Sequence, residues 1–457
     1  MVKFSCTVVK NGWGNKMGFT IEELIEATGA TPIIVNDGED DLTISTDTRA
    51  IGEGMIYLPL KGENFNGFEF IQDALDKGAS GYFTESADDV NLDAEVILLV
   101  KDTKAAYLKI AEFYRDKINP TTIMITGSSG KTTVKEMMAS VMSVKYRVHK
   151  TKLNHNNEIG LCQTFLTMPE STQVLIAEGG MRGLGEIELI SKHTKPDRAV
   201  ITNVGTAHIG RLGSVENIAK AKCEIVKYLK KDGCLIAPDN NLIKRFNDFS
   251  GKSIYVNFDF IKVVKADESG SEFVYGEETY YLPQEGLHNV QNASLVIETA
   301  LSLGMKPDEI REGLKSFKTI DKRWEVKDIG AFKVINDCYN SNPDSVKAAI
   351  KTFSEIYNGT KIIVLGDMGE LGENAVKYHV ETGKYLERFN FDCLVTCGEL
   401  SKNINPDKDV DIKHFDNKAE VAEYISKKYK DGGYILLKAS RSMKFEDIIE
   451  ELNKKCR

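Results

Sequence analysis

The segment MITGSSGKTTVKEM at residues 124–137 restricts the possible folds of this chain more than any other. It runs from an apolar strand through a glycine-rich turn into a helical pattern. Glycines at 127 and 130 let successive backbone N–H groups converge on phosphate oxygens, and the start of the following helix adds a favourable dipole. The segment therefore predicts a phosphate-binding loop between a strand and a helix.

The loop differs from the general mononucleotide motif G-x-x-x-x-G-K-[ST], because Ile125 stands five positions before Gly130. We expect the Lys131 ammonium to neutralise terminal phosphates and the Thr132 hydroxyl to reach magnesium. The alternative is an ordinary turn with a solvated lysine. The residues predicted to bind nucleotide here are Gly127, Ser128, Ser129, Gly130, Lys131, Thr132 and Thr133.

Apolar strands alternate with helices after residue 119, and the alternation restarts after residue 322. This is the pattern of parallel sheets covered on both faces. A length of 457 residues exceeds one ordinary core. NPTT at 119–122 and TIDK at 319–322 predict the boundaries. We expect an α/β protein of three domains, at 1–118, 119–319 and 320–457, of which the first mixes short helices and strands.

The composition excludes some classes of protein. The formal net charge is -9, which argues against a nucleic-acid surface. No apolar run approaches a membrane span, and the first 17 residues lack the apolar stretch of a signal peptide. The eight cysteines are scattered and are expected to be core thiols in a reducing compartment. We therefore expect a cytoplasmic protein without stable membrane insertion.

Three side chains downstream of the loop stand where a phosphate site could use them. Glu178 ends the strand VLIAE, and its carboxylate could complete a magnesium shell at the carboxyl edge of the sheet. His208 lies in a glycine-rich loop after another strand. Lys222 lies on a partly apolar helix face, where a lysine usually extends its charge to solvent. Each of them alone is more often structural or solvated than functional.

Taken together, the motifs resemble the Mur ligases, ATP-dependent enzymes that form amide bonds in peptidoglycan synthesis. The resemblance extends through nearly the whole chain. Within the family, the chain resembles the ligase of EC type 6.3.2.10, which joins D-alanyl-D-alanine to UDP-N-acetylmuramoyl-tripeptide. The blocks that carry it, in family order, are STDTRAIGEGMIYLPLKGENFNGFEF, TGSSGKTTVKEM, NHNNEIG, AEGGMRGLGEI, TNVGTAHIGRLGS, AKAKCEI, GLHNVQNA, KRWEV, NDCYNSNPDS, GDMGELG and LLKASRS.

The resemblance implies a fold and a set of roles. The first domain would bind the UDP part of the substrate, the second would be a P-loop ATPase-like parallel sheet, and the third would be Rossmann-like. Thr132 and Glu178 would hold one magnesium, and His208 and a carbamoylated Lys222 a second. The catalytic residues implied are Lys131, Asn157, Glu178, His208, Lys222 and Arg323; the further nucleotide contacts are Asn289, Asn292, Arg323 and Asp337; and the substrate contacts are Asp47, Thr48, Arg49 and Lys61.

Some features depart from the family pattern or remain open. Cys338 and Ala439 replace other small residues, and about 15 residues precede MGFTIEEL without an assigned role. The alternatives are another Mur ligase step that adds a single amino acid, folylpolyglutamate synthase, and a nucleotide-binding paralogue without catalysis. We expect a monomer that acts on small molecules. Whether the third residue of the tripeptide is lysine or diaminopimelate is left open.

Overall fold

The computed structural model describes residues 18–36, 41–62, 64–88, 90, 93–152, 155–318 and 322–456. The extension before MGFTIEEL and most of the second predicted boundary lie outside these ranges. The chain divides into two compact units, one of residues 1–121 and 147–175 and one of residues 122–146 and 176–457. Each unit is described separately below.

The first unit contains a small mixed sheet with the strand order β1-β7-β6-β3-β2. Strand β1 pairs antiparallel with β7, and the other pairs are parallel. The sheet and β4, β5 and β9 have the bounds β1 Thr31–Val35, β2 Ile44–Ser45, β3 Ile56–Tyr57, β4 Lys61–Gly62, β5 Phe65–Asn66, β6 Gly81–Thr84, β7 Val96–Leu99 and β9 Val148–Lys150. The helices are α1 Ile21–Thr28, α2 Ile71–Asp76, α3 Thr103–Ile118 and α5 Glu158–Leu166.

The helix ends in this unit follow from local sequence. Thr20 and Glu23 form a reciprocal capping box at the start of α1. Asp102 caps α3 by accepting from the Ala105 N–H, and Asn119 ends α3 in a left-handed conformation. The predicted break at NPTT therefore coincides with a true helix end.

The second unit begins with a parallel sheet in which β13, β12, β11 and β8 lie side by side, and β10 follows beyond β8. The bounds are β8 Thr121–Thr126, β10 Val174–Glu178, β11 Arg198–Ile201, β12 Cys234–Pro238 and β13 Lys252–Val256. The helices of this region are α4 Lys131–Met142, α6 Glu186–Thr194, α7 Ile209–Leu212, α8 Val215–Cys223, α9 Asn241–Phe246, α10 Leu287–Ser302 and α11 Pro307–Lys315.

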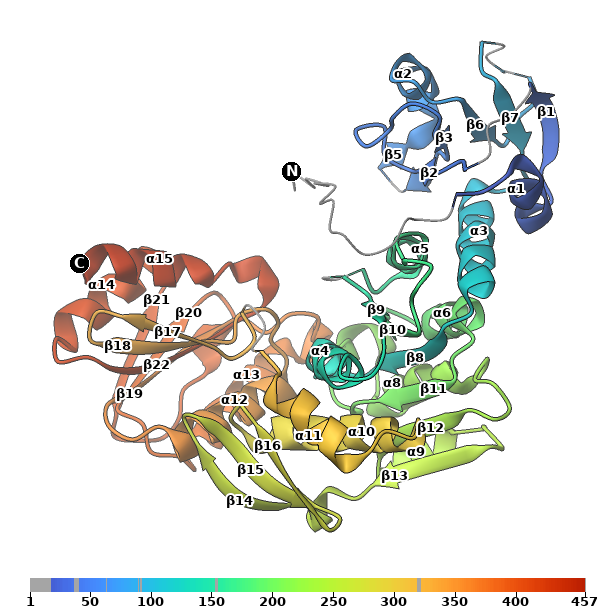
Figure 1. Cartoon of the computed structure of the whole chain (residues 1–457). Helices are drawn as coiled ribbons and strands as arrows, with labels where there is room; N and C mark the ends of the chain where they lie inside the picture. The colour runs from blue at the N-terminus through green and yellow to red at the C-terminus, as the bar shows by residue number, and fades with distance from the viewer. Residues whose placement is uncertain are drawn as a thin grey trace. The chain divides into compact units, whose positions relative to one another are not determined.

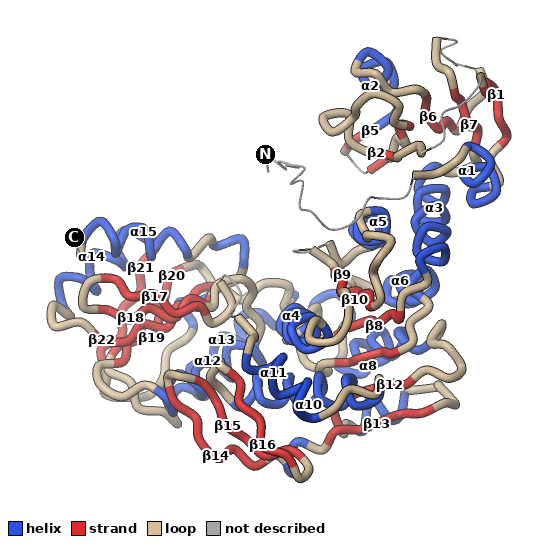
Figure 2. The backbone as a smooth tube through the Cα atoms, viewed as in Figure 1, coloured by secondary structure: helices blue, strands red, loops and turns tan. Residues whose placement is uncertain are grey.

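Helices cover both faces of this sheet. Helix α4 packs on α10 and α11, and α10 also contacts β11, β12 and β13. Helix α8 packs on α6 and α9. Strands β10 and β12 are fully buried and β8 is buried after its first residue, as expected of parallel strands between two helix layers. A separate antiparallel sheet follows, with the strands β14 Lys262–Asp267, β15 Gly270–Tyr275 and β16 Glu278–Leu282 (Figure 2).

The second unit ends with a sheet of order β17-β18-β22-β19-β20-β21, parallel except for β17 (Figure 1). The strands are β17 Glu325–Ile329, β18 Phe332–Asn336, β19 Lys361–Gly366, β20 Cys393–Cys397, β21 Asp411–Phe415 and β22 Gly433–Lys438. The helices are α12 Pro343–Ile356, α13 Ala375–Leu386, α14 Lys418–Lys428 and α15 Glu446–Lys455.

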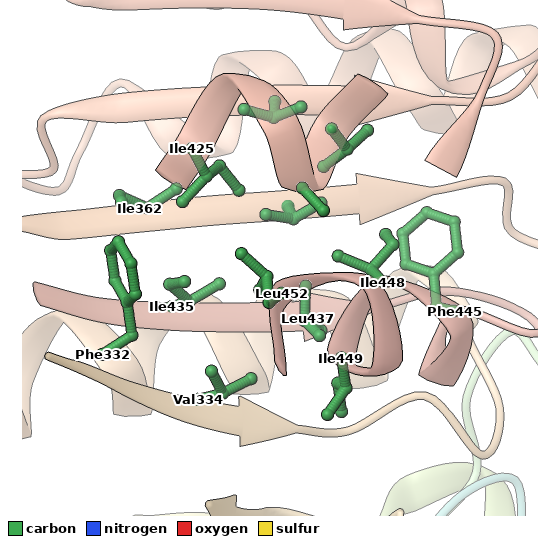
Figure 3. Packing of buried hydrophobic residues seen from close by; sticks show 14 of the residues in the cluster. Phe332, Val334, Ile362, Ile425, Ile435, Leu437, Phe445, Ile448, Ile449 and Leu452 are labelled. Atoms are coloured by element: carbon green, nitrogen blue, oxygen red, sulfur yellow. The ribbon is translucent and has the colours of Figure 1, made fainter. Parts of the chain in front are cut away.

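Helices α14 and α15 pack on one face of this last sheet. Figure 3 shows Ile425 of α14 and Leu452 of α15 against Ile362, Ile435 and Leu437 of the central strands. The alternate strand residues Ile363 and Leu436 are also buried, so both faces of the sheet are covered. This arrangement is the Rossmann-like one expected for the C-terminal region.

The α/β class predicted from the sequence is confirmed. The seven cysteines within the described ranges are free thiols, and all but Cys456 are buried. None of the helices described here is long and apolar enough to cross a membrane. The three domain ranges predicted above remain a prediction.

Candidate functional site

The phosphate loop, residues 127–130, connects β8 to α4 as the sequence predicts. Gly130 forms the N-cap of α4 with φ 77°, a left-handed conformation that favours glycine, and no side chain caps the helix start. A Cβ on Gly127 would lie 1.8 Å from Thr202 Oγ1. The glycines thus provide the close backbone approach that an anion at this helix start requires.

Two residues after β11 hold the loop. Thr202 Oγ1 donates to the Ser129 carbonyl oxygen at 2.5 Å, and Asn203 Oδ1 accepts from the Ser129 N–H at 2.9 Å. Asn203 Nδ2 also donates to Ser129 Oγ at 2.7 Å. Ser128 Oγ accepts from the Gly205 N–H at 2.9 Å. The loop is therefore fixed by its neighbour in the same sheet before any ligand binds.

Thr132 and Glu178 form a pair of oxygen ligands beside the loop. Thr132 Oγ1 lies 3.0 Å from Glu178 Oε2, and the Glu178 side chain is 3% exposed. The Lys135 ammonium, also buried, lies 3.4 Å from the same carboxylate oxygen. Among the described residues no three His, Cys, Asp or Glu side chains gather into a metal cluster. The hydroxyl and carboxylate fit a magnesium ion that takes its remaining ligands from phosphate and water.

Lys131 occupies a site where positive charge is concentrated. Its Nζ donates to the Gly127 carbonyl oxygen at 2.8 Å across the loop. Burial lowers the pKa of Lys131, the Arg323 guanidinium lowers it further, and the Glu178 carboxylate opposes the change. Arg323 itself lies against the Tyr339 ring, 3.9 Å from its centroid. Two cations close to one loop are suited to a polyanion such as a nucleotide triphosphate.

Lys222 is buried, contrary to the usual behaviour of a lysine on a partly apolar helix face. Only 1% of it is exposed, on α8. Burial lowers its pKa well below the ordinary value, and the charge of Lys131 adds to the effect. No carboxylate in the described ranges pairs with this amine. A buried amine with a lowered pKa fits carbamoylation, and a carbamate would supply an anionic oxygen ligand.

His208 ends the loop that follows β11. We call the last residues of that loop, 206–208, the His208 loop. Its Nδ1 lies 2.6 Å from Glu370 Oε2. This contact lowers the pKa of Glu370, because the imidazole stabilises the ionised carboxylate. The histidine predicted to be a metal ligand is thus joined to a residue of the C-terminal region.

The predicted adenine and ribose contacts differ in what they touch. Asn292 lies over the loop, since a Cβ on Gly130 would come 2.8 Å from its Oδ1. Asn289 is 3% exposed, and its Nδ2 donates to the Glu285 carbonyl oxygen at 2.8 Å, which is the helix-start role. Asp337 Oδ2 accepts from the buried Lys438 ammonium at 2.6 Å. Their nucleotide contacts remain predictions.

The remaining predicted residues belong to the first unit. Arg49 and Asp47 form a two-point ion pair at 2.7 and 2.8 Å, which lowers the pKa of Asp47, and Lys77 and Thr48 together lower the pKa of Asp73. Lys61 lies 3.6 Å from Glu85 and over the Phe68 ring.

Asn157, also of this unit, caps α5 by accepting from the Gly160 N–H at 2.9 Å. Each of these first-unit side chains therefore has a local structural contact, and its predicted role remains a prediction.

Sequence reasoning did not single out Asp344 and Glu370. Asp344 Oδ2 accepts from the Thr206 N–H at 2.7 Å and from the Thr206 hydroxyl at 2.8 Å. Both carboxylates lie in the blocks NDCYNSNPDS and GDMGELG, which were noted for resemblance alone. The available signal was an acidic residue soon after a strand, in an asparagine-rich segment for Asp344 and in a glycine-rich segment for Glu370.

Known proteins match the chain over most of its length. Residues 125–300 match the Mur ligase middle domain, and residues 322–441 match the Mur ligase, glutamate ligase domain. The UDP-N-acetylmuramoyl-tripeptide--D-alanyl-D-alanine ligase of Bacillus subtilis is 36% identical over 427 residues, which are 90% of this chain and 92% of that protein.

Solved structures agree. The crystal structure of MurF from Acinetobacter baumannii has a TM-score of 0.88 at 29% identity, covering 95% of this chain and 99% of that one. MurF from Thermotoga maritima, solved in complex with ADP, has a TM-score of 0.82 at 26% identity, covering 91% and 97%. The chain belongs to the Mur ligase family and, within it, to the UDP-N-acetylmuramoyl-tripeptide--D-alanyl-D-alanine ligases.

Proposed function

We propose that the protein joins D-alanyl-D-alanine to UDP-N-acetylmuramoyl-tripeptide with cleavage of ATP to ADP and phosphate. The observation that carries the proposal is the cluster of Lys131, Arg323, Thr132 and Glu178 at the phosphate loop. Such a set neutralises a triphosphate and holds its magnesium, but contains no nucleophile of its own. It supports a reaction in which the substrate carboxylate is the nucleophile.

The reaction has two steps. A carboxylate oxygen of the tripeptide attacks the γ-phosphorus of ATP in line, so that the bond to the β-γ bridging oxygen breaks and ADP leaves with the electron pair. The product is an acyl phosphate. The amine of D-alanyl-D-alanine then attacks the acyl carbon, and the tetrahedral intermediate expels phosphate. The amine loses a proton, and the amide bond remains.

The residues of the chain serve this reaction by position and charge. The Lys131 ammonium and the loop N–H groups bind the β- and γ-phosphates, and Arg323 reaches the γ-phosphate. Thr132 and Glu178 would hold one magnesium, and His208 with a carbamoylated Lys222 would hold another. Such ions would supply positive charge beside the phosphoryl oxygens. Asn157 lies near the γ-phosphate, Asn289 and Asn292 contact adenine, and Asp337 contacts the ribose.

Asp47, Thr48, Arg49 and Lys61 bind the UDP part of the substrate. The exposed Arg49 guanidinium, 65% accessible, suits a diphosphate, although it must then exchange part of its contact with Asp47. We further propose three domains at 1–118, 119–319 and 320–457, a monomeric state and a cytoplasmic location. Closure of the third domain on the second assembles the site, because Arg323 and Lys131 come from different ones.

The test is ADP release from ATP and magnesium with UDP-muramoyl-tripeptides that end in lysine or in diaminopimelate. Each is offered no acceptor, single amino acids, or D-alanyl-D-alanine, and the product is weighed by mass spectrometry. ADP release that needs D-alanyl-D-alanine and yields the pentapeptide supports the proposal. Dependence on a single amino acid would move the chain to another Mur ligase step, and nucleotide binding without ADP release would make it a paralogue without catalysis.

A further inference from the structure

The His208 loop is held from outside its own sheet. Asp344, in the first turn of α12, accepts two hydrogen bonds from Thr206, one from the backbone and one from the hydroxyl. The approach is close, because a Cβ on Gly205 would lie 2.4 Å from Asp344 Oδ2. The carboxylate therefore fixes the backbone of the loop two residues before His208.

A second contact follows on the other side of His208. The Gly210 N–H donates to the Glu370 carbonyl oxygen at 3.1 Å, and Glu370 Oε2 lies 2.6 Å from His208 Nδ1. A Cβ on Gly210 would lie 2.4 Å from the Gly372 nitrogen, so two glycines are needed where the segments cross.

His208 and Glu370 both have left-handed backbones, with φ 65° and φ 61°. Non-glycine residues take up this conformation where their surroundings impose it, commonly at functional sites.

The short contact determines which imidazole nitrogen can bind a metal. Glu370 Oε2, at 2.6 Å, is the polar atom that faces the buried Nδ1, and this nitrogen makes no other hydrogen bond within the described residues. A carboxylate at this distance favours the ring form with its proton on Nδ1, because two lone pairs would repel. In that tautomer the free electron pair is on Nε2, for which the structure records no polar partner among the described residues. A carboxylate on the distal nitrogen of a metal-binding histidine fixes the tautomer and the orientation of the ring.

We propose that Glu370 and Asp344, two residues of the C-terminal region, are positioning residues that orient the His208 imidazole toward a metal. Glu370 sets the tautomer and Asp344 anchors the loop. Docking of the C-terminal region is then a condition for the metal site and not only for nucleotide contacts. The inference rests on the proposed function in one respect, the naming of His208 as a metal ligand.

The test measures Mn²⁺ binding to the full chain in bicarbonate buffer without substrates, by electron paramagnetic resonance. Glu370→Gln is expected to weaken the Mn²⁺ site about tenfold, the lower end of the effect of losing such a partner. Asp344→Asn is expected to weaken it less. The ¹⁵N resonances of the His208 ring, assigned by their loss in His208→Gln, should shift from the Nδ1–H pattern in Glu370→Gln.

Glu373→Gln is the matched control, because its exposed carboxylate lies one turn away without a polar partner among the described residues. It should leave both signals unchanged. Equal Mn²⁺ affinity and equal ring resonances in Glu370→Gln and wild type would overturn the inference. If Glu370→Gln unfolds, Glu370→Asp decides by the same signals. If ADP release by the wild-type protein did not depend on D-alanyl-D-alanine, the proposed function would be refuted. The Mn²⁺ measurement would still test the inference about Glu370 separately.

Discussion

The phosphate loop and the His208 loop follow neighbouring strands, but they are held in opposite ways. The phosphate loop is fixed by Thr202 and Asn203 of the adjacent strand end. The His208 loop is fixed by Asp344 and Glu370, more than 130 residues later in the sequence. The first should keep its shape in the middle region alone, while the second needs the C-terminal region. Nucleotide binding and turnover should therefore respond to different mutations.

The largest effect is expected for Lys131→Ala, which removes a cation from the preorganised loop. Loss of one such electrostatic contact lowers turnover by about 10³-fold. Because the loop keeps its bonds to Thr202 and Asn203, the thermal unfolding midpoint should change little. ADP release and differential scanning calorimetry measure the two quantities. Lys220→Ala, an exposed lysine of α8, is the control, and a Lys131→Ala enzyme with near wild-type turnover would contradict the role assigned to Lys131.

Alanine at one glycine of each region should separate the two functions. Gly130→Ala forces a left-handed backbone on alanine, at a cost of about 1–2 kcal/mol, and directs a methyl group at Asn292. It should raise the KM for ATP about tenfold. Gly210→Ala directs a methyl group at the Gly372 nitrogen and should lower kcat about tenfold with the KM for ATP unchanged, because only the His208 contact is disturbed.

Steady-state kinetics at varied ATP measure both effects. Gly183→Ala is the control, since its Cβ would meet nothing nearer than 3.7 Å. If Gly210→Ala raised the KM for ATP as much as Gly130→Ala, the two loops would not be independent.

The difference between the loops also explains what the sequence could predict. The phosphate loop was readable because strand, glycines, lysine and helix are contiguous, and contiguous patterns have a fixed geometry. The strand and helix alternation predicted both parallel sheets for the same reason. The contact of His208 with Glu370 depends on how two sheets pack, which no local pattern specifies.

Lys222 shows a second limit. Its partly apolar helix face indicated a lysine reaching solvent, and only the family resemblance indicated a functional group. The structure buries it together with Ala219 and Ile225, which lie about one turn before and after Lys222 and belong to the core. Burial depends on the neighbours that a helix meets, and these lie outside the helix's own sequence. For Asn289 the local sequence indicated a hydrogen bond at the helix start, and the structure contains such a bond to the Glu285 carbonyl oxygen.

Lys222→Met should stabilise the protein, because a buried amine with a lowered pKa costs free energy. At neutral pH the unfolded chain protonates Lys222 more fully than the folded chain, so the folded state is penalised. The penalty falls as the pH rises toward the ordinary lysine pKa of about 10.4.

In buffer free of carbon dioxide, the variant should therefore unfold a few degrees above wild type at pH 7, and the gain should shrink by pH 10. Thermal unfolding across this pH range measures it. A constant gain at all pH values would contradict a depressed pKa and leave only a packing effect.

The smallest effect is expected for Thr206→Val, which removes one of the two hydrogen bonds that Thr206 donates to Asp344 and leaves the backbone bond of 2.7 Å. Loss of about 1 kcal/mol corresponds to a roughly fivefold lower kcat, with the KM for ATP unchanged. Asp344→Asn in the Thr206→Val background should then cost less than it does alone, because both changes affect the same contact. Effects on kcat that simply multiply would mean that Asp344 acts on turnover by a route other than the His208 loop.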